Sequence, residues 1–116
     1  MTATADRPSV PEIVEAGIHR TGTAMRHADA RYERGQITLD QHWRILAELH
    51  ARRVRWWAVL ERHVLDDRTT PLVFYRAVLG ARDNAHRIAR YWHQQAATVT
   101  AVADTAVAEH ETGIAR

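Results

Sequence analysis

The sequence predicts an all-α protein, an antiparallel bundle of three principal helices. Three observations favour this class. The 116 residues include twenty alanines but only five glycines and three prolines, a composition that favours helix. Apolar residues recur at spacings of three and four in long stretches. Capping motifs mark the expected start of each stretch, and the connections between them are short.

The first helix is predicted to span residues 11–34. The segment Ser9-Val10-Pro11-Glu12 has the S-x-x-E spacing of a capping box, with proline in the first turn. Apolar and small residues then form one helical stripe, at Val14, Ile18, Thr21, Met25, Ala28 and Tyr32. Gly35 is positioned to end the helix in a left-handed conformation. Gly17 lies near the stripe, where the absence of a side chain allows close approach to the backbone.

The second helix is predicted over 38–67. Thr38 and Gln41 form a second capping box, of the type T-x-x-Q. Only two residues separate Gly35 from Thr38, and so short a connection makes the first two helices an antiparallel hairpin.

The third helix is predicted over 71–110, with Thr70 as N-cap and Pro71 at the first helical position. Its apolar stripe has heptad spacing, at Val78, Ala81, Ala85, Ile88, Trp92, Gln95, Val99, Val102 and Ala106. Gly80 interrupts this region, so the helix is expected either to continue or to break there, which would make four helices.

Residues 1–116 are expected to form a single domain, with flexible tails at 1–9 and 112–116. The chain has no cysteine, which excludes a disulfide framework and a thiolate zinc site. The first residues lack the basic start and apolar stretch of a signal peptide. No uncharged apolar run approaches the roughly 18 residues that a membrane-spanning helix needs. A cytoplasmic location is the resulting expectation.

The stretch HARRVRWW, residues 50–57, places arginines next to tryptophans. On a helical wheel it separates into two faces, and Trp56 and Trp57 fall on a broad apolar arc with Leu46, Leu49 and Leu60. Both tryptophans are therefore predicted to pack in the core, at least one of them largely buried. Arg53 lies in the middle of the same arc and needs an acceptor. Asp29 is one candidate; a group on a second chain is another.

The sequence offers little support for catalysis or metal binding. There is no Gly-rich phosphate loop, and Ser9, the only serine, fits a capping role. The histidine–carboxylate pairs Glu15/His19 and Asp83/His86, and the spacing of His86 from His93, do not make a metal-ligand motif. No catalytic residue, metal ligand or cofactor is expected. A helical-bundle enzyme or metal-binding protein is the weaker alternative.

All sixteen cationic residues are arginine, and they are unevenly distributed. Residues 38–98 carry ten arginines against six acids (+4), whereas 99–116 carry one against three (−2). One group of arginines could contact nucleic acid or a partner protein: Arg44, Arg52, Arg55, Arg62, Arg87 and Arg90. The net charge of only +2 and the interleaved glutamates argue for a solvated face instead. DNA or RNA binding is thus an alternative function.

The leading hypothesis is a non-enzymatic module that acts by protein association, as a homodimer. The third helix is predicted to be longer than the first two can cover, and an uncovered apolar stripe commonly packs against a second chain. The residues expected at the interface are Arg53, Trp56, Trp57, Val99, Val102 and Ala106.

Overall fold

The computed structural model describes residues 7–115 of the chain, with all of their side chains except those of 103 and 110–115. It consists of α1 (Val10–Glu33), α2 (Leu39–Asp66) and α3 (Leu72–Ala115), and the described residues contain no strand. The predicted all-α class is confirmed. The predicted tail at 1–9 lies mostly outside the described residues. The segment 112–115, also predicted as tail, continues α3.

The predicted caps form at the starts of α1 and α2, and Gly35 follows the end of α1. The Ser9 hydroxyl accepts a hydrogen bond from the Glu12 backbone N–H at 3.3 Å, so Ser9 is the N-cap, but the reciprocal bond from the Ser9 N–H to the Glu12 side chain that would complete the predicted capping box is absent among the described residues. Thr38 and Gln41 bond reciprocally, at 3.1 Å and 2.8 Å, and complete the capping box. Gly35 has a φ of 71°, the left-handed conformation that suits glycine after a helix. Local chemistry therefore fixes this turn.

The alternative break at Gly80 was wrong, because α3 runs without interruption from Leu72 to Ala115. One glycine in a helix costs about 1 kcal/mol relative to alanine, which is too little to break a helix whose neighbouring turns are held by packing. Val78 and Ala81, on either side, are both half-buried. The helix begins one residue later than predicted, where the Pro71 carbonyl accepts the Phe74 N–H at 3.0 Å.

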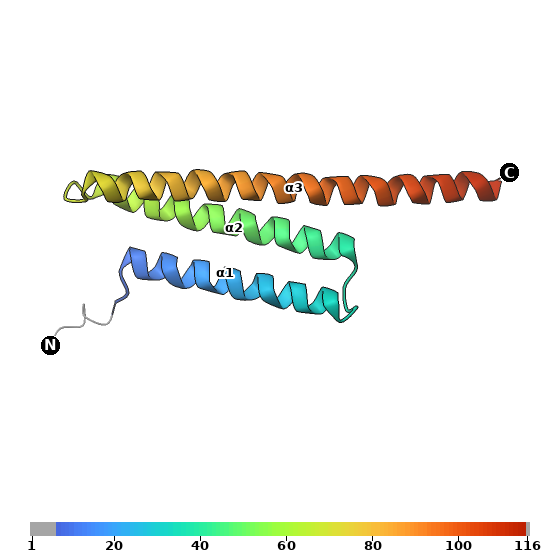
Figure 1. Cartoon of the computed structure of the whole chain (residues 1–116), viewed down its shortest axis with the longest axis horizontal. Coiled ribbons are helices and arrows are strands. Elements are labelled where there is room, and N and C mark those ends of the chain that lie inside the picture. The colour runs from blue at the N-terminus through green and yellow to red at the C-terminus, as the bar shows by residue number, and fades with distance from the viewer. Residues whose placement is uncertain (1–6, 116) are drawn as a thin grey trace.

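The three helices form an open arrangement with α2 in the middle (Figure 1). Both α1 and α3 pack against α2, whereas α1 and α3 do not contact each other in the described part of the chain. The fully covered residues are consequently few and mostly small, and they lie along the two seams: Val14, Thr21, Ala28, Ile37, Leu46, Ala47, Leu49, His50, Ala85 and Ala96. Each outer helix leaves much of its surface uncovered.

The α3 helix is much longer than the helix that supports it. Its 44 residues span about 66 Å, whereas the 28 residues of α2 span about 42 Å. The C-terminal part of α3 therefore projects past the start of α2, as Figure 1 shows, and the molecule measures 75 × 29 × 19 Å. We call the segment 101–115 the α3 extension.

Candidate functional site

The Trp56 indole packs directly on the α1 backbone at Gly17. A Cβ atom built on Gly17 would overlap the six-membered ring of this indole. On α1, the guanidinium of Arg20 lies 5.9 Å from the Trp56 ring centroid, a cation–π distance. The prediction was that at least one tryptophan of the HARRVRWW stretch would be largely buried. Both of them are half-buried.

Arg53 lies in the seam between α1 and α2 without a carboxylate partner. Its Nη2 donates to the Met25 sulfur at 3.8 Å, and its buried Nε has no hydrogen-bond partner. No Asp or Glu among the described residues forms an ion pair with it. Asp29, the candidate acceptor within the chain, instead lies 2.7 Å from the Nε2 of His42. Asp29 is therefore not the acceptor, and Arg53 is a half-buried charge with a weak acceptor within the chain.

Replacing Arg53 by methionine is expected to stabilise the protein by about 1 kcal/mol. Methionine keeps the aliphatic stem against α1 and removes a charge that the seam desolvates without compensation. Urea unfolding monitored by circular dichroism measures the difference. Arg55→Met is the matched control, since Arg55 is exposed on the same helix, and its effect should stay within about 0.5 kcal/mol. A destabilised Arg53→Met protein would mean that the guanidinium has a strong acceptor.

An aromatic cluster around Trp92 joins α2 to α3. The His50 ring stacks on Trp92, with centroids 5.8 Å apart and an angle of 3°, and Trp43 meets Trp92 edge-on at 6.2 Å. His50 is buried, and its Nδ1 has no partner. Burial lowers the pKa of His50, and the positive charge of Arg53 lowers it further. The neutral imidazole is thus the form that the folded state favours.

Stability should therefore fall as the pH drops below about 6.5, the ordinary histidine pKa. A lowered folded-state pKa means that the unfolded chain binds more protons between the two pKa values, so acid favours unfolding in that window. Urea unfolding at about pH 7.5 and 5.5 should show a smaller pH difference for His50→Gln than for the parent. Equal differences in the two proteins would contradict this role of His50.

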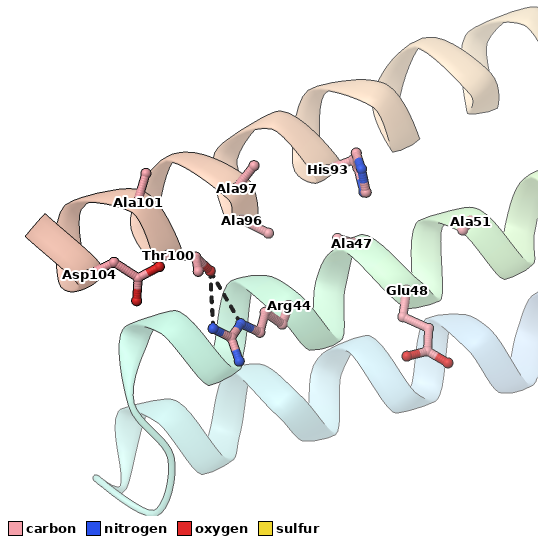
Figure 2. Close-up of a pocket in the computed structure, with 10 residues that line it drawn as sticks. All are labelled: Arg44, Ala47, Glu48, Ala51, His93, Ala96, Ala97, Thr100, Ala101 and Asp104. Atoms are coloured by element: carbon pink, nitrogen blue, oxygen red, sulfur yellow. Dashed lines mark hydrogen bonds between the residues drawn. The ribbon is translucent and has the colours of Figure 1, made fainter.

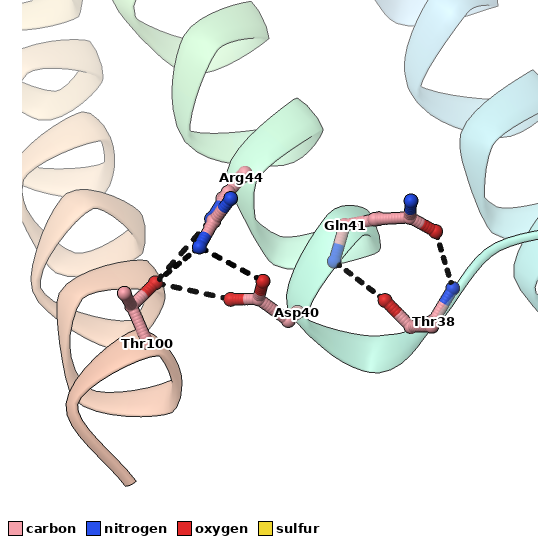
Figure 3. Close-up of polar contacts among 5 residues, drawn as sticks. All are labelled: Thr38, Asp40, Gln41, Arg44 and Thr100. Atoms are coloured by element: carbon pink, nitrogen blue, oxygen red, sulfur yellow. Dashed lines mark hydrogen bonds and ion pairs between the residues drawn. The ribbon is translucent and has the colours of Figure 1, made fainter. Parts of the chain in front are cut away.

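A polar triangle fixes the point where the α3 extension begins (Figure 3). Arg44 forms an ion pair with Asp40 at 3.0 Å and donates to the Thr100 hydroxyl, and Thr100 donates to Asp40 at 3.0 Å. The N-terminal turns of α2 are thereby tied to α3.

Next to this triangle, α2 and α3 border a groove of about 540 Å³. Half of its lining residues are alanines, and polar groups are found at its ends and edges (Figure 2). The lining residues are Arg44, Ala47, Glu48, Ala51, His93, Ala96, Ala97, Thr100, Ala101 and Asp104. The polar groups do not converge on one point, so the groove is better suited to a helix or an apolar side chain than to catalysis.

The six arginines predicted to bind a partner are not equally available. Arg44 and Arg52 are engaged by Asp40 and Glu48, and Arg87 donates to the Asn84 amide at 3.5 Å. The other three are exposed and form no ion pair with a described residue: Arg55, Arg62 and Arg90. Half of the predicted surface is thus already involved in contacts within the chain.

The residues of the predicted interface lie in two places. Arg53 and Trp56 contact α1 within the chain, as described above, and Trp57 is half-buried on the same helix. Val99 is half-buried, whereas Val102 is 64% exposed and Ala106 is also exposed on the α3 extension. The extension is therefore the part of this predicted set that is open to a second chain.

Other apolar side chains, which the sequence patterns did not single out, are also exposed. Tyr91 is 54% exposed near the middle of α3, and Val107 is 57% exposed on the extension. A group at the α2–α3 turn is exposed to a similar degree, namely Leu65, Leu72, Val73 and Phe74. A helical wheel of α3 could have identified Tyr91, because this residue lies away from the apolar heptad stripe.

Among the described residues, no three His, Asp or Glu side chains gather in a group that could hold a metal ion. Within the same residues, no helix combines the length and apolar character needed to cross a membrane.

Comparison with protein families, with curated proteins and with solved structures finds no match to this chain.

Proposed function

We propose that this protein is a non-enzymatic helical module that acts by protein–protein association, in the first place as a homodimer. The observation that carries the proposal is the α3 extension, a helical segment that projects beyond its supporting helix while keeping apolar side chains such as Val102 and Val107 exposed. An isolated helix of this size is marginal in water, and helices of proteins owe most of their stability to packing. A second chain would supply that packing.

The open arrangement of the helices supports the same proposal. Because α1 and α3 touch only α2, the chain buries few large side chains, although nearly half of its residues are apolar. Small domains with an insufficient core of their own commonly complete it by oligomerisation.

Sedimentation equilibrium of the full chain tests this function. The expected mass is twice the monomer mass of 13.3 kDa. Val102→Glu should shift the protein toward monomer, while Thr23→Glu, at an exposed position of α1, should not. A parent protein that stays monomeric at high micromolar concentration would remove the homodimer.

Nucleic-acid binding is the second candidate, and the unpaired, exposed Arg55, Arg62 and Arg90 favour it. Phosphate contacts release counterions, so binding would weaken steeply with salt. Electrophoretic mobility with a random duplex at two salt concentrations measures this. No shift with micromolar protein at low salt would rule out this candidate.

A further inference from the structure

We propose that the homodimer forms through the outer face of α3, which pairs antiparallel with the α3 helix of a second copy across a two-fold axis at Tyr91. This inference rests on the proposed function, because it names the surface and geometry of the association. The outer face comprises Gly80, Asn84, Arg87, Tyr91, Thr98 and Val102.

These six residues form one continuous surface. At 3.6 residues per turn they lie within about 60° of one another around the helix axis. All six are exposed, and they are turned away from Ala85 and Ala96, which are buried on the side facing α2. A helix docked here would therefore meet neither α2 nor α1.

The charge distribution along α3 selects the antiparallel orientation. Residues 72–90 contain four arginines and one aspartate, a net charge of +3 (4 − 1), whereas 99–115 contain three acids and no arginine, a net charge of −3. With Tyr91 at the centre of an antiparallel pair, residues 72–90 of each helix lie beside residues 92–110 of the other, which contain Asp104 and Glu109 and no arginine (net −2), twice by symmetry. A parallel pair would place like charges together, which is unfavourable. A second copy of this chain thus has the complementary charge pattern.

The spacing of residues along the face fixes the register at Tyr91. Asn84 and Thr98 lie seven residues to either side of it, and Gly80 and Val102 lie eleven residues to either side. With Tyr91 on the two-fold axis, each Val102 faces Gly80 of the other copy. A Cβ atom at Gly80 would meet nothing within 4 Å, so this point is flat and open, while Val102 is 64% exposed. A protruding side chain then meets a gap, as in knobs-into-holes packing.

The register also gives Gly80 and the length of α3 a role. Gly80 weakens the helix without being needed for its conformation, since its φ is not positive. Facing Val102 of a second copy, it allows the two backbones to approach closely. The α3 extension supplies both that valine and the acidic half of the charge pattern. The α3 helix must therefore extend beyond α2 for this pair to form.

Cross-linking of single-cysteine variants tests the geometry, because the natural chain contains no cysteine. With a short bismaleimide, Tyr91→Cys should cross-link to itself. Gly80→Cys and Val102→Cys should not do so alone but should cross-link when mixed. Ala16→Cys, exposed on α1, is the control and should stay uncross-linked. Self-cross-linking of Gly80→Cys and of Val102→Cys would indicate a parallel pair. Cross-linking of Val102→Cys to Ala51→Cys would place the second copy in the groove between α2 and α3. Either result overturns the proposal.

Sedimentation of two Tyr91 variants separates this inference from the proposed function. Tyr91→Glu places two like charges at the axis and should raise the dimer Kd by at least about tenfold. Tyr91→Phe keeps the ring and should leave the Kd within about threefold. A dimer that forms equally well with Tyr91→Glu and lacks the predicted cross-links leaves homodimerisation intact and removes this interface. A parent that is monomeric overturns both.

Discussion

Gly17→Ala is expected to destabilise the protein by about 2 kcal/mol, although alanine is the better helix former. The added methyl group would overlap the six-membered ring of the Trp56 indole, which packs directly on the α1 backbone. Either the indole leaves the α1 surface or the two helices separate. Urea unfolding at one fixed protein concentration measures the loss, since self-association makes stability concentration-dependent.

Gly22→Ala in the same helix is the matched control and should stabilise the protein by up to about 1 kcal/mol. A Cβ atom there would make only ordinary contact with the Arg26 side chain, at 3.7 Å. In a Trp56→Ala background, Gly17→Ala should also become stabilising, because the overlap is gone. If Gly17→Ala stabilises the parent protein, the indole does not lie on this backbone.

Local features of the fold were predictable because they depend on residues close in sequence. The caps at Ser9 and Thr38 and the left-handed Gly35 need only their immediate neighbours, and all three are confirmed. Gly80 was ambiguous for a related reason. The loss of helix stability that Gly80 causes is a local effect, but the packing that keeps α3 helical at this residue comes from α2.

The packing of the helices on one another was not predictable from periodicity. A stripe shows which face of a helix is covered, but not which helix covers it or in which register. The stack of His50 on Trp92 and the contact of Arg44 with Thr100 both depend on the α2–α3 register. Asp29, the candidate acceptor for Arg53 within the chain, pairs with His42 instead, and this depends on the α1–α2 register. The long α3 was expected from its heptad stripe, whereas the candidate surface around Tyr91 required knowing which side α2 covers.

Trp92→Ala is expected to destabilise the protein by about 3 kcal/mol. The indole contacts Trp43 and His50 on α2 at once, and no α1 residue can move in to fill the space, because α1 does not reach α3. The resulting cavity would open to water. Urea unfolding of this variant gives the loss directly.

The same substitution should change how stability depends on pH. Burial is the main cause of the lowered pKa of His50, and the stacked Trp92 indole covers one face of the imidazole. Without the indole, water reaches the imidazole, so its folded-state pKa rises toward the ordinary value of about 6.5 and the difference from the unfolded state shrinks. The destabilisation on going from about pH 7.5 to 5.5 should then be smaller in Trp92→Ala than in the parent. Trp92→Phe keeps an aromatic face on His50 and should retain most of the parent's pH dependence. A Trp92→Ala protein with the full pH dependence would show that the seam closes again over His50 without the indole.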